Sequence, residues 1–295
     1  MASLHSKVAL VSGVSSGIGQ SIARALVRSG FRVFGTSRNA GGIEGVSGVD
    51  LLPLDVGADE SVRSCVQTVL ARAGRIDCLV NNAGYVLGGA AEEVSIEEAK
   101  RQFETNFFGV MRMVKAVLPA MRLQQRGRII NISSLAGLVA APPFWGVYAA
   151  SKWALEAYSE HLRREVKPFG IGVSVVEPGS IKTNLTRNQS VAAAPIRDYD
   201  PWRERAFAAA RRFESNAPDP SVVADCVLRI VEARAPRLRY RVGAEATWVP
   251  RLHRIVPAAV FEKLIKRLFD IDIATTSSRR GASDRGDRPQ ETGRG

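Results

Sequence analysis

The segment VALVSGVSSGIGQSIARALVRSG, from Val8 to Gly30, joins a short apolar run to a glycine-rich turn and then to a stretch with helical periodicity. The run Val8–Ser12 has the length and composition of a buried strand, and Gly17–Ser29 has the apolar spacing of a helix. The segment therefore predicts a strand, a tight turn and a helix, which together begin a βαβ unit.

The same alternation of short apolar runs and helical segments continues along the chain, and it is typical of a parallel sheet covered by helices. The other predicted strands are Arg32–Thr36, Val49–Leu54, Cys78–Asn81, Arg128–Ser133, Gly172–Glu177 and Leu238–Val242. The other predicted helices are Asp59–Ala73, Ser95–Gln125, Tyr148–Lys167 and Ser221–Ala233. We expect a single α/β domain with a doubly wound parallel sheet of about seven strands, in which ligands bind at the strand ends.

Three segments depart from this rhythm. The connection 184–217 is Ala- and Arg-rich and contains Pro195 and Pro201; so long a connection in a compact domain is usually functional or mobile. The stretch at about 247–270 predicts a helical extension, because Val260, Leu264 and Leu268 share one helical face. Residues 275–295 have almost no apolar side chains, so we expect a disordered tail after one domain over 1–274.

Lys and Arg exceed Asp and Glu by 41 − 29 = 12, an excess that suits an anionic ligand, an acidic membrane surface or nucleic acid. Much of it lies beyond residue 200, and no zinc-finger, RRM-like or helix-turn-helix signature is present. We therefore do not expect nucleic-acid binding. If the basic tail did bind nucleic acid, the affinity would fall steeply with salt and vanish on deletion of 275–295.

The cysteines Cys65, Cys78 and Cys226 are scattered in apolar surroundings without metal-like spacing. This predicts buried thiols in a reducing compartment, with neither a disulfide framework nor a metal site. The N-terminal residues lack the apolar core of a signal peptide, and no segment has the roughly 18 apolar residues of a membrane span. A cytoplasmic protein is expected.

Gly13, Gly17 and Gly19 form a GxxxGxG pattern at the start of the first helix. Glycines there let the backbone approach a pyrophosphate, whose charge the helix's N-terminal amides favour. The alternative is a glycine-rich turn with no ligand. In a dinucleotide site the loop residues Ser15, Ser16 and Ile18 would also contact the cofactor.

The second strand ends in Gly35-Thr36-Ser37-Arg38, where a carboxylate would bind the ribose hydroxyls of NAD(H). Instead Arg38 offers several donors for a 2′-phosphate, and Ser37 leaves room for one. We therefore expect NADP(H) in preference to NAD(H). The alternative is an exposed surface arginine.

Polar residues also end the third and fourth strands. Asp55, followed by Val56, is placed to accept from the adenine amino group, and Asn82-Ala83-Gly84 would contact the cofactor. The Asn side chains of this run could also join neighbouring strands, and ordinary turn chemistry is the alternative.

Tyr148 and Lys152 lie four residues apart on a predicted helix and therefore share one face. Lowering a phenol pKa from near 10 by about three units requires about 4 kcal/mol. One positive charge about 4 Å away supplies about that much at an effective dielectric near 20. Lys152, helped by an oxidised nicotinamide, is thus expected to make Tyr148 an acid–base near neutrality. Ser133 or Ser134, at a nearby strand end, is expected to hold the substrate oxygen, and we favour Ser134.

Together these residues resemble the classical short-chain dehydrogenase/reductase family over about Lys7 to Val242. The family's TGxxxGIG appears as Ser12 through Gly19, with Ser12 in place of Thr; NNAG and YxxxK are intact. The resemblance implies a Rossmann-type fold and hydride transfer between a nicotinamide and a carbonyl or alcohol. The spacing of fourteen residues from Ser134 to Tyr148 is one longer than the family pattern.

The resemblance also implies roles for further residues. Asn106 is similar to the helix Asn that completes a proton relay through water to the Lys. Pro178 and Gly179 are similar to the turn that faces the nicotinamide, and Ile181 and Thr183 to residues that hold its carboxamide. Tyr148, Lys152, Ser134 and Asn106 would thus be the catalytic group, and the family usually forms homodimers or homotetramers.

The connection 184–217 stands where the family keeps its substrate lid, and the side chains Trp202, Phe207 and Phe213 make it apolar. The approach to Tyr148 is expected to be lined from the other side by Val139, Ala140, Pro143, Phe144 and Trp145. This favours an apolar substrate, as in members that act on steroids, retinoids or long-chain carbonyls. The lid aromatics could equally be core residues.

Two alternatives stay open. The C-terminal cations Arg251, Arg254, Lys263, Lys266 and Arg267 flank an apolar face. That face could contact an anionic membrane, although we favour packing against protein because most amphipathic helices do so. The chain could also be an NADP(H)-binding sensor or scaffold, but the intact YxxxK motif favours an enzyme.

Overall fold

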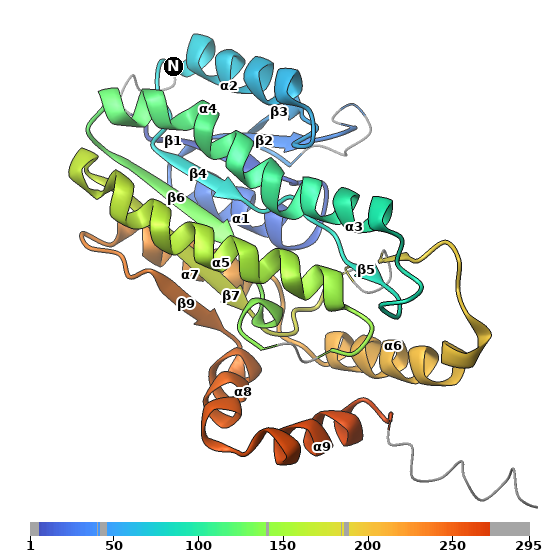
Figure 1. The fold of residues 1–295 in the computed structure, drawn as a ribbon. Coiled ribbons are helices and arrows are strands. Elements are labelled where there is room, and N and C mark those ends of the chain that lie inside the picture. The colour runs from blue at the N-terminus through green and yellow to red at the C-terminus, as the bar shows by residue number, and fades with distance from the viewer. Residues whose placement is uncertain are drawn as a thin grey trace, which may run out of the picture.

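The computed structural model describes residues 6–39, 41, 46–139, 142–183, 185 and 189–271. Its centre is a seven-stranded sheet in the order β3-β2-β1-β4-β6-β7-β9, with every pair parallel (Figure 1). The strands are β1 Val8–Ser12, β2 Arg32–Ser37, β3 Val49–Pro53, β4 Cys78–Asn81, β6 Gly127–Ile132, β7 Ile171–Pro178 and β9 Arg239–Val242. The predicted doubly wound sheet is confirmed. The strand order reverses between β1 and β4, which opens a crevice at their carboxyl ends.

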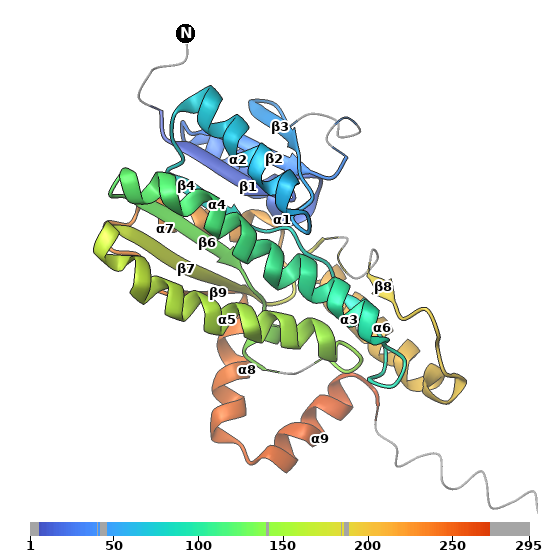
Figure 2. The same cartoon turned by 45° about the horizontal axis from the view of Figure 1, so that its top comes forward.

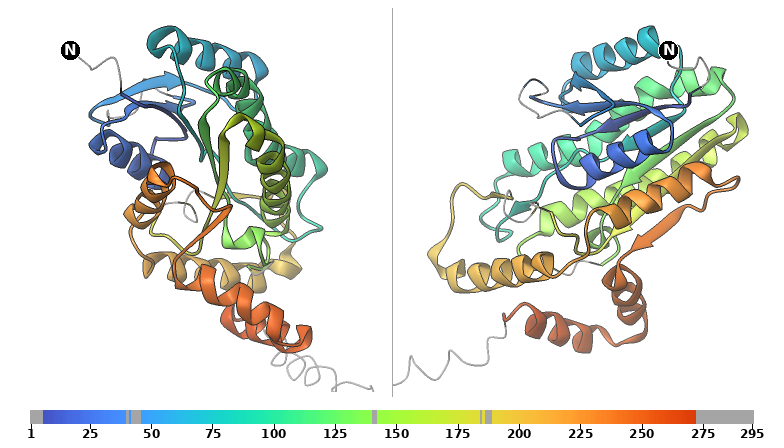
Figure 3. Two further views of the ribbon diagram at one scale, coloured as in Figure 1. Left: turned by 90° about the vertical axis from the view of Figure 1, so that its left-hand side faces the viewer. Right: turned by 180° about the vertical axis from the view of Figure 1, so that it is seen from behind.

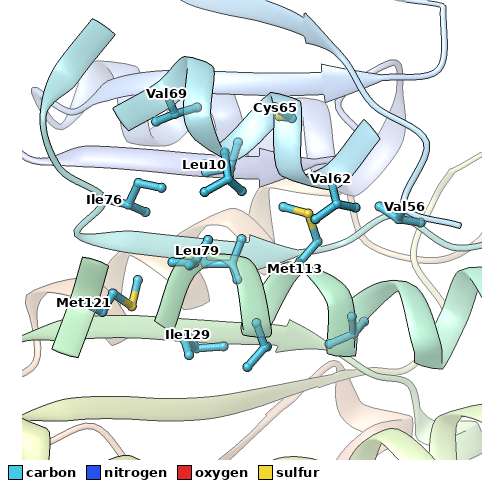
Figure 4. Packing of buried hydrophobic residues seen from close by; sticks show 14 of the residues in the cluster. Leu10, Val56, Val62, Cys65, Val69, Ile76, Leu79, Met113, Met121 and Ile129 are labelled. Atoms are coloured by element: carbon cyan, nitrogen blue, oxygen red, sulfur yellow. The ribbon is translucent and has the colours of Figure 1, made fainter. Parts of the chain in front are cut away.

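Helices cover both faces of this sheet (Figures 2 and 3). One layer consists of α2 Asp59–Ala73, α4 Gly109–Leu123 and α5 Gly146–Val166, and the other of α1 Gly17–Arg28 and α7 Ser221–Glu232. Along β1, Val8 and Leu10 face the first layer, whereas Ala9 and Val11 face the second. Because both faces are buried, the strand is continuously apolar. Figure 4 shows the packing of the first layer against the sheet.

The segment predicted as one helix, Ser95–Gln125, is helical from Ile96 to Leu123 and contains one π-helical turn. It consists of α3 Ile96–Phe103, a π-helical turn at Glu104–Phe108, and α4. Ser95 caps α3 in a capping box with Glu98. The predicted helix is therefore present, but its π-helical turn was not predicted, because apolar periodicity does not reveal one extra residue in a single turn.

Two further regions lie beside the carboxyl edge of the sheet (Figure 1). Strand β8 Ser190–Val191 pairs with β5 Leu87–Gly88, and α6 Asp200–Ser215 follows it. We call residues 189–217 the β8–α6 segment; Asn184, where the connection was predicted to begin, lies outside the described residues. After β9 come α8 Ala244–Ile255 and α9 Ala258–Leu268. The tail expected at 275–295 also lies outside them.

Cys65, Cys78 and Cys226 are free and buried, as predicted. Across the described ranges, no helix combines the length and apolarity that crossing a membrane requires. Within the same ranges, no group of three His, Cys, Asp or Glu side chains is placed to hold a metal ion.

Candidate active site

The turn between β1 and α1 is built on glycines. Gly13 and Gly17 have φ values of +73° and +57°, a region that favours glycine. A Cβ on Gly19 would lie 2.1 Å from the Gly13 carbonyl oxygen, so no side chain fits there. The amides of Gly13 and Val14 donate to the Thr36 carbonyl at 3.0 and 2.9 Å, which ties the turn to the end of β2.

A cavity of about 340 Å³ opens at this turn. The predicted cofactor residues that line it are Gly13, Ser15, Ser16, Gly17, Ile18, Gly19, Ser37, Arg38, Asp55, Val56, Asn82, Ala83, Gly84, Tyr148, Lys152 and Thr183. It therefore joins the strand end that carries Arg38 to the predicted catalytic pair. Its glycine cradle, its free helix N-terminus and its single arginine form a donor set that fits a dinucleotide phosphate.

Three predicted cofactor residues do not line this cavity: Pro178, Gly179 and Ile181. Pro178 ends β7, and the Gly179 amide donates to the Val242 carbonyl at 2.9 Å. Ile181 is buried in the core on the α1 and α7 side of the sheet. In the structure, Gly179 is therefore hydrogen-bonded to the end of β9, and Ile181 packs in the core.

Cavity residues that the sequence analysis did not assign to the cofactor are Thr36, Leu54, Tyr85, Thr105, Ile132, Ser133 and Leu185. Four of these seven, Thr36, Leu54, Tyr85 and Ser133, are immediate sequence neighbours of a predicted site residue after a strand. Adjacency to a predicted strand end was therefore the signal that could have identified them.

The carboxyl ends of β1 and β4 are joined by Ser12 and Asn82. The Ser12 hydroxyl accepts from the Asn82 and Ala83 amides, both at 3.0 Å. The Asn82 side chain donates to the Ser12 and Gly13 carbonyls at 3.0 and 2.9 Å. Asn82 thus fixes the backbone that forms this part of the cavity wall, and its side-chain nitrogen already donates to two carbonyls.

Arg38 is exposed at the end of β2, and no carboxylate stands beside it in that strand. The neighbouring Ser37 hydroxyl accepts from the Asn39 amide at 3.3 Å. Asp55, at the end of β3, is exposed and accepts from the Gly57 amide at 2.9 Å. Arg38 and Asp55, which were expected to contact the adenosine half of the cofactor, therefore border the same cavity.

Tyr148 is buried near the start of α5. The Ser134 hydroxyl accepts from the Ala136 amide at 3.1 Å, which fixes its orientation. Burial raises the pKa of Tyr148, and the nearby Ser134 side chain opposes that rise. The structure therefore places Ser134 near the phenol, although Ser133 is the serine that lines the cavity.

Lys152 is buried one turn after Tyr148, with its Nζ 5.8 Å from the centroid of the phenol ring. Its ammonium donates to the Ile132 carbonyl at 2.9 Å. Burial lowers the pKa of Lys152 to about 8, and the charge of Glu156 opposes that fall. In the protein without cofactor the Lys152 ammonium is held at the Ile132 carbonyl, so the lowering of the Tyr148 pKa by Lys152 together with an oxidised nicotinamide stays a prediction.

Asn106 lies in the π-helical turn and is buried. Its Oδ1 accepts from the Tyr85 amide at 3.1 Å, and its Nδ2 donates to the Tyr85 carbonyl at 3.0 Å and to Ser151 Oγ at 3.3 Å. Asn106 thus holds the loop after β4 against α5. A π-helical turn in such a position is often found at functional sites.

The family model for short chain dehydrogenases matches residues 7–193. The chain belongs to this family. It is an oxidoreductase whose family acts on carbonyl and CH–OH groups. The Rossmann-type fold implied by the sequence motifs is likewise confirmed.

Among curated relatives, this short-chain dehydrogenase is 40% identical over 242 residues to a 3-ketodihydrosphingosine reductase from Bacteroides thetaiotaomicron, covering 81% of this chain and 89% of the relative. It is 35% identical over 272 residues to retinol dehydrogenase 8 from Bos taurus, covering 85% and 86%.

Solved structures agree with this family and fold. A short-chain dehydrogenase from Streptomyces avermitilis has a TM-score of 0.76 at 34% identity and covers 90% of this chain and 98% of its own. One from Burkholderia phymatum, in complex with NAD, has a TM-score of 0.74 at 25% identity, covering 86% and 95%. An actinorhodin polyketide ketoreductase with NADPH has a TM-score of 0.72 at 32% identity, covering 83% and 99%. These complexes support a nicotinamide cofactor for the family site and do not choose between its two forms.

The approach to Tyr148 in this short-chain dehydrogenase is aromatic. Trp145 and Tyr148 stack edge to face with ring centroids 6.1 Å apart. Phe144 makes edge contacts at 6.4 Å with Phe207 of α6 and with Tyr199. Of the predicted lid aromatics, Phe207 is therefore the one whose ring contacts this approach.

The other aromatics predicted for the lid lie elsewhere. Phe213 packs against Phe269 at 5.7 Å, and Arg205 stacks on Trp202 at 5.3 Å. Val139, expected at the approach, packs with Phe261 of α9. Ala140 lies outside the described residues. The α9 helix thus contacts both α6 and the segment that leads to Tyr148.

Proposed function

We propose that this short-chain dehydrogenase is an NADP(H)-dependent oxidoreductase that interconverts a carbonyl and a primary or secondary alcohol on an apolar substrate. The observation that carries the proposal is the buried phenol of Tyr148, near Ser134 and one turn from Lys152, in the wall of a cavity that begins at the glycine turn. A phenol so placed can act as a general acid, and the glycine turn of the same cavity suits the phosphates of a dinucleotide that would carry the hydride.

A bound nicotinamide dinucleotide would supply or accept the hydride. Tyr148 would donate its proton to the carbonyl oxygen during reduction and take it back during oxidation. Ser134, whose side chain opposes the rise in the pKa of that phenol, would orient the same oxygen. Lys152 would hold the cofactor's ribose, and its ammonium would favour the phenolate left after proton transfer. Asn106 would position the α5 end of this group through Tyr85 and Ser151.

The preference for NADP(H) is supported by Arg38. It is exposed at the rim of the cavity, where its guanidinium can bind a 2′-phosphate. The absence of a carboxylate in β2 removes the group that would bind the two ribose hydroxyls of NAD(H).

The apolar substrate is supported by the aromatic approach and by the names of the two relatives, whose substrates are a sphingoid ketone and a retinoid. Val86, Ala136, Tyr148 and Ala149 form one buried cluster with Trp145 packed against it. A homodimer or homotetramer in the cytoplasm stays a prediction.

The experiment is a comparison of turnover with NADPH and NADH on a panel of long-chain ketones, aldehydes and retinal. The parent protein is expected to reduce at least one of them with NADPH. Tyr148→Phe is expected to lower kcat by about 10²-fold or more, because it removes the proton donor while keeping the ring. NADPH binding, read by fluorescence, should persist in this variant.

Arg38→Asp serves as the cofactor variant. It should raise KM for NADPH at least tenfold and lower the KM ratio of NADH to NADPH, because it exchanges a phosphate donor for a hydroxyl acceptor. Full turnover by Tyr148→Phe would contradict the enzymatic role and favour a cofactor-binding sensor. An unchanged cofactor ratio in Arg38→Asp would contradict the NADP(H) preference.

A further inference from the structure

The C-terminal helices α8 and α9 pack against the protein through only part of their apolar surface. Phe261 and Ile265 contact Val139 and Leu138, and Phe269 stacks on Phe213 of α6. These contacts use one side of α9. They hold the pair of helices beside the β8–α6 segment, below the carboxyl edge of the sheet in Figure 1.

A second apolar side of each helix is exposed. On α8, Trp248, Leu252 and Ile255 follow one another at helical spacing, and on α9 Val260, Leu264 and Leu268 do the same. These six side chains are between 40% and 83% exposed. We call them the α8–α9 apolar surface. An apolar face of this kind marks an interaction site rather than ordinary surface.

Cations accompany this surface. Arg251 stacks on Trp248 with its guanidinium 5.1 Å from the ring centroid. Lys263 and Arg267 lie on α9 next to the exposed row, and Arg254 immediately precedes Ile255 near the end of α8. Within the described ranges, none of these four cations has an ion-pair partner.

The acidic residues of the same region are already engaged. Glu262 pairs with Lys266 at 2.7 Å, Asp270 with Arg205 at 3.9 Å, and Glu245 accepts from the Ser180 hydroxyl at 2.7 Å. The charge left beside the apolar surface is therefore positive. A partner that complements it must present apolar groups together with negative charge.

We propose that the α8–α9 apolar surface docks this protein on a membrane that contains anionic phospholipid. The exposed row on each helix would enter the boundary between headgroups and acyl chains, and the four cations would contact the phosphates. Trp248 is the residue type that favours this boundary. A second copy of the chain fits less well, because a two-fold contact would bring the same unpaired cations together.

The position of the surface suggests what docking achieves. Helix α9 contacts α6 and Val139, and α6 contacts the aromatic approach to Tyr148 through Phe207. A membrane at α8 and α9 would therefore lie beside the segment that covers the site. This link rests on the proposed function, since it gives an apolar substrate a short path from the bilayer. The docking itself does not depend on turnover.

The test is flotation of the full chain with vesicles of phosphatidylcholine alone or with phosphatidylglycerol added. The parent should bind the mixed vesicles and be released by high salt. The double variant Trp248→Ser and Leu264→Ser should bind the mixed vesicles at least roughly tenfold more weakly than the parent. The same loss is expected for the double variant Arg251→Gln and Lys263→Gln. Leu123→Ser is the matched control, because Leu123 is 86% exposed on α4 at a different place.

Each variant is first checked for an unchanged melting temperature and unchanged reduction of a water-soluble aldehyde. Equal vesicle binding by the parent and by both double variants would overturn the proposal, and so would no binding by the folded parent. The parent could fail to bind vesicles while light scattering gives the Trp248→Ser, Leu264→Ser double variant half the mass of the parent. That result would instead assign the surface to a second copy of the chain. Because binding is read without substrate, its failure leaves the proposed reductase activity untouched.

Discussion

Glu177, near the end of β7, is a fully buried carboxyl beside Arg239 and Arg241, and Arg239 also pairs with the carboxyl of Glu156. Its oxygens lie 3.3 Å from Arg239 and 3.4 Å from Arg241. Burial raises the pKa of Glu177 to about 7, the charge of Glu156 adds to the rise, and the arginines oppose it. Burial likewise raises the pKa of Glu156, against Ser133 and Arg239.

A folded-state pKa above the unfolded value makes stability fall as pH rises. The folded protein keeps the Glu177 proton up to about pH 7, whereas the unfolded chain releases it at its ordinary pKa of 4.5. The free energy of unfolding should therefore fall by about 1–3 kcal/mol between pH 4.5 and 7. In Glu177→Gln this fall should be much smaller, as urea unfolding at several pH values would measure.

Glu160 supplies a control on the same arginine. Its carboxyl bonds to Arg239 at 2.9 Å, and the hydrogen bonds from Arg239 and Arg164 lower its pKa. Its contribution is lost as pH falls, which is the opposite sign, so Glu160→Gln should keep the fall between pH 4.5 and 7. A pH profile unchanged in Glu177→Gln would show that another group carries the dependence.

At the scale of elements, the carboxyl of Glu93 makes the one buried ion pair between the β8–α6 segment and the loop before α3, among the contacts of the described residues. Glu93, in the loop before α3, accepts from the Ala90 amide at 2.7 Å and from the Ile196 amide at 2.8 Å, and it pairs with Arg203 of α6. Both Glu93 and Arg203 are buried. Removing one partner of a buried pair typically costs about 3–5 kcal/mol.

Glu93→Gln is therefore expected to let the β8–α6 segment open more often. Amide hydrogen exchange in α6 should accelerate at least tenfold, while exchange in the central sheet stays unchanged. Arg205→Gln is the control on the same helix, because its pair with Asp270 spans 3.9 Å and is largely exposed. Equal exchange in Glu93→Gln and the parent would show that the other contacts, such as the β5–β8 ladder and the Ala193–Glu98 hydrogen bond, hold the segment.

The elements differ in how well the sequence predicts them. Each end of the seven strands lies within one residue of its prediction, because a strand buried on both faces is an unbroken apolar run between turn residues. The pair β5 and β8 was missed, since two-residue strands carry no pattern. Helix α6 was missed too, although Pro201 in its first turn is a start signal.

The site residues also differ in how well the sequence predicts them. Residues placed by strand ends and by the glycine turn were predicted, because the sheet brings those ends to one edge. The link from the Asn82 side chain to the end of β1 was also expected. Other side-chain contacts were not: Lys152 bonds to Ile132, and Val139 packs against α9. Such contacts depend on rotamers and on elements distant in sequence, which periodicity does not report.

At the scale of the whole molecule, the three buried thiols are distributed over the cores on both faces of the sheet. Cys65 of α2 belongs to the core on one face of the sheet, and Cys78 and Cys226 belong to the core on the other. Burial raises the pKa of Cys65 to about 11 and that of Cys78 to about 12, and it raises that of Cys226 as well. Because the thiolate is the nucleophile, all three should react slowly in the native state.

Labelling with a thiol reagent should be at least about 100-fold slower for the native protein than for free cysteine. Because both helical layers pack on the same sheet, unfolding of the sheet disrupts the core on each of its faces. Added urea should therefore expose the three thiols together, with one midpoint in peptide mass spectrometry. Labelling of Cys226 at urea concentrations that still protect Cys65 would contradict this, since it would mean that α1 and α7 leave the sheet while the opposite layer stays folded.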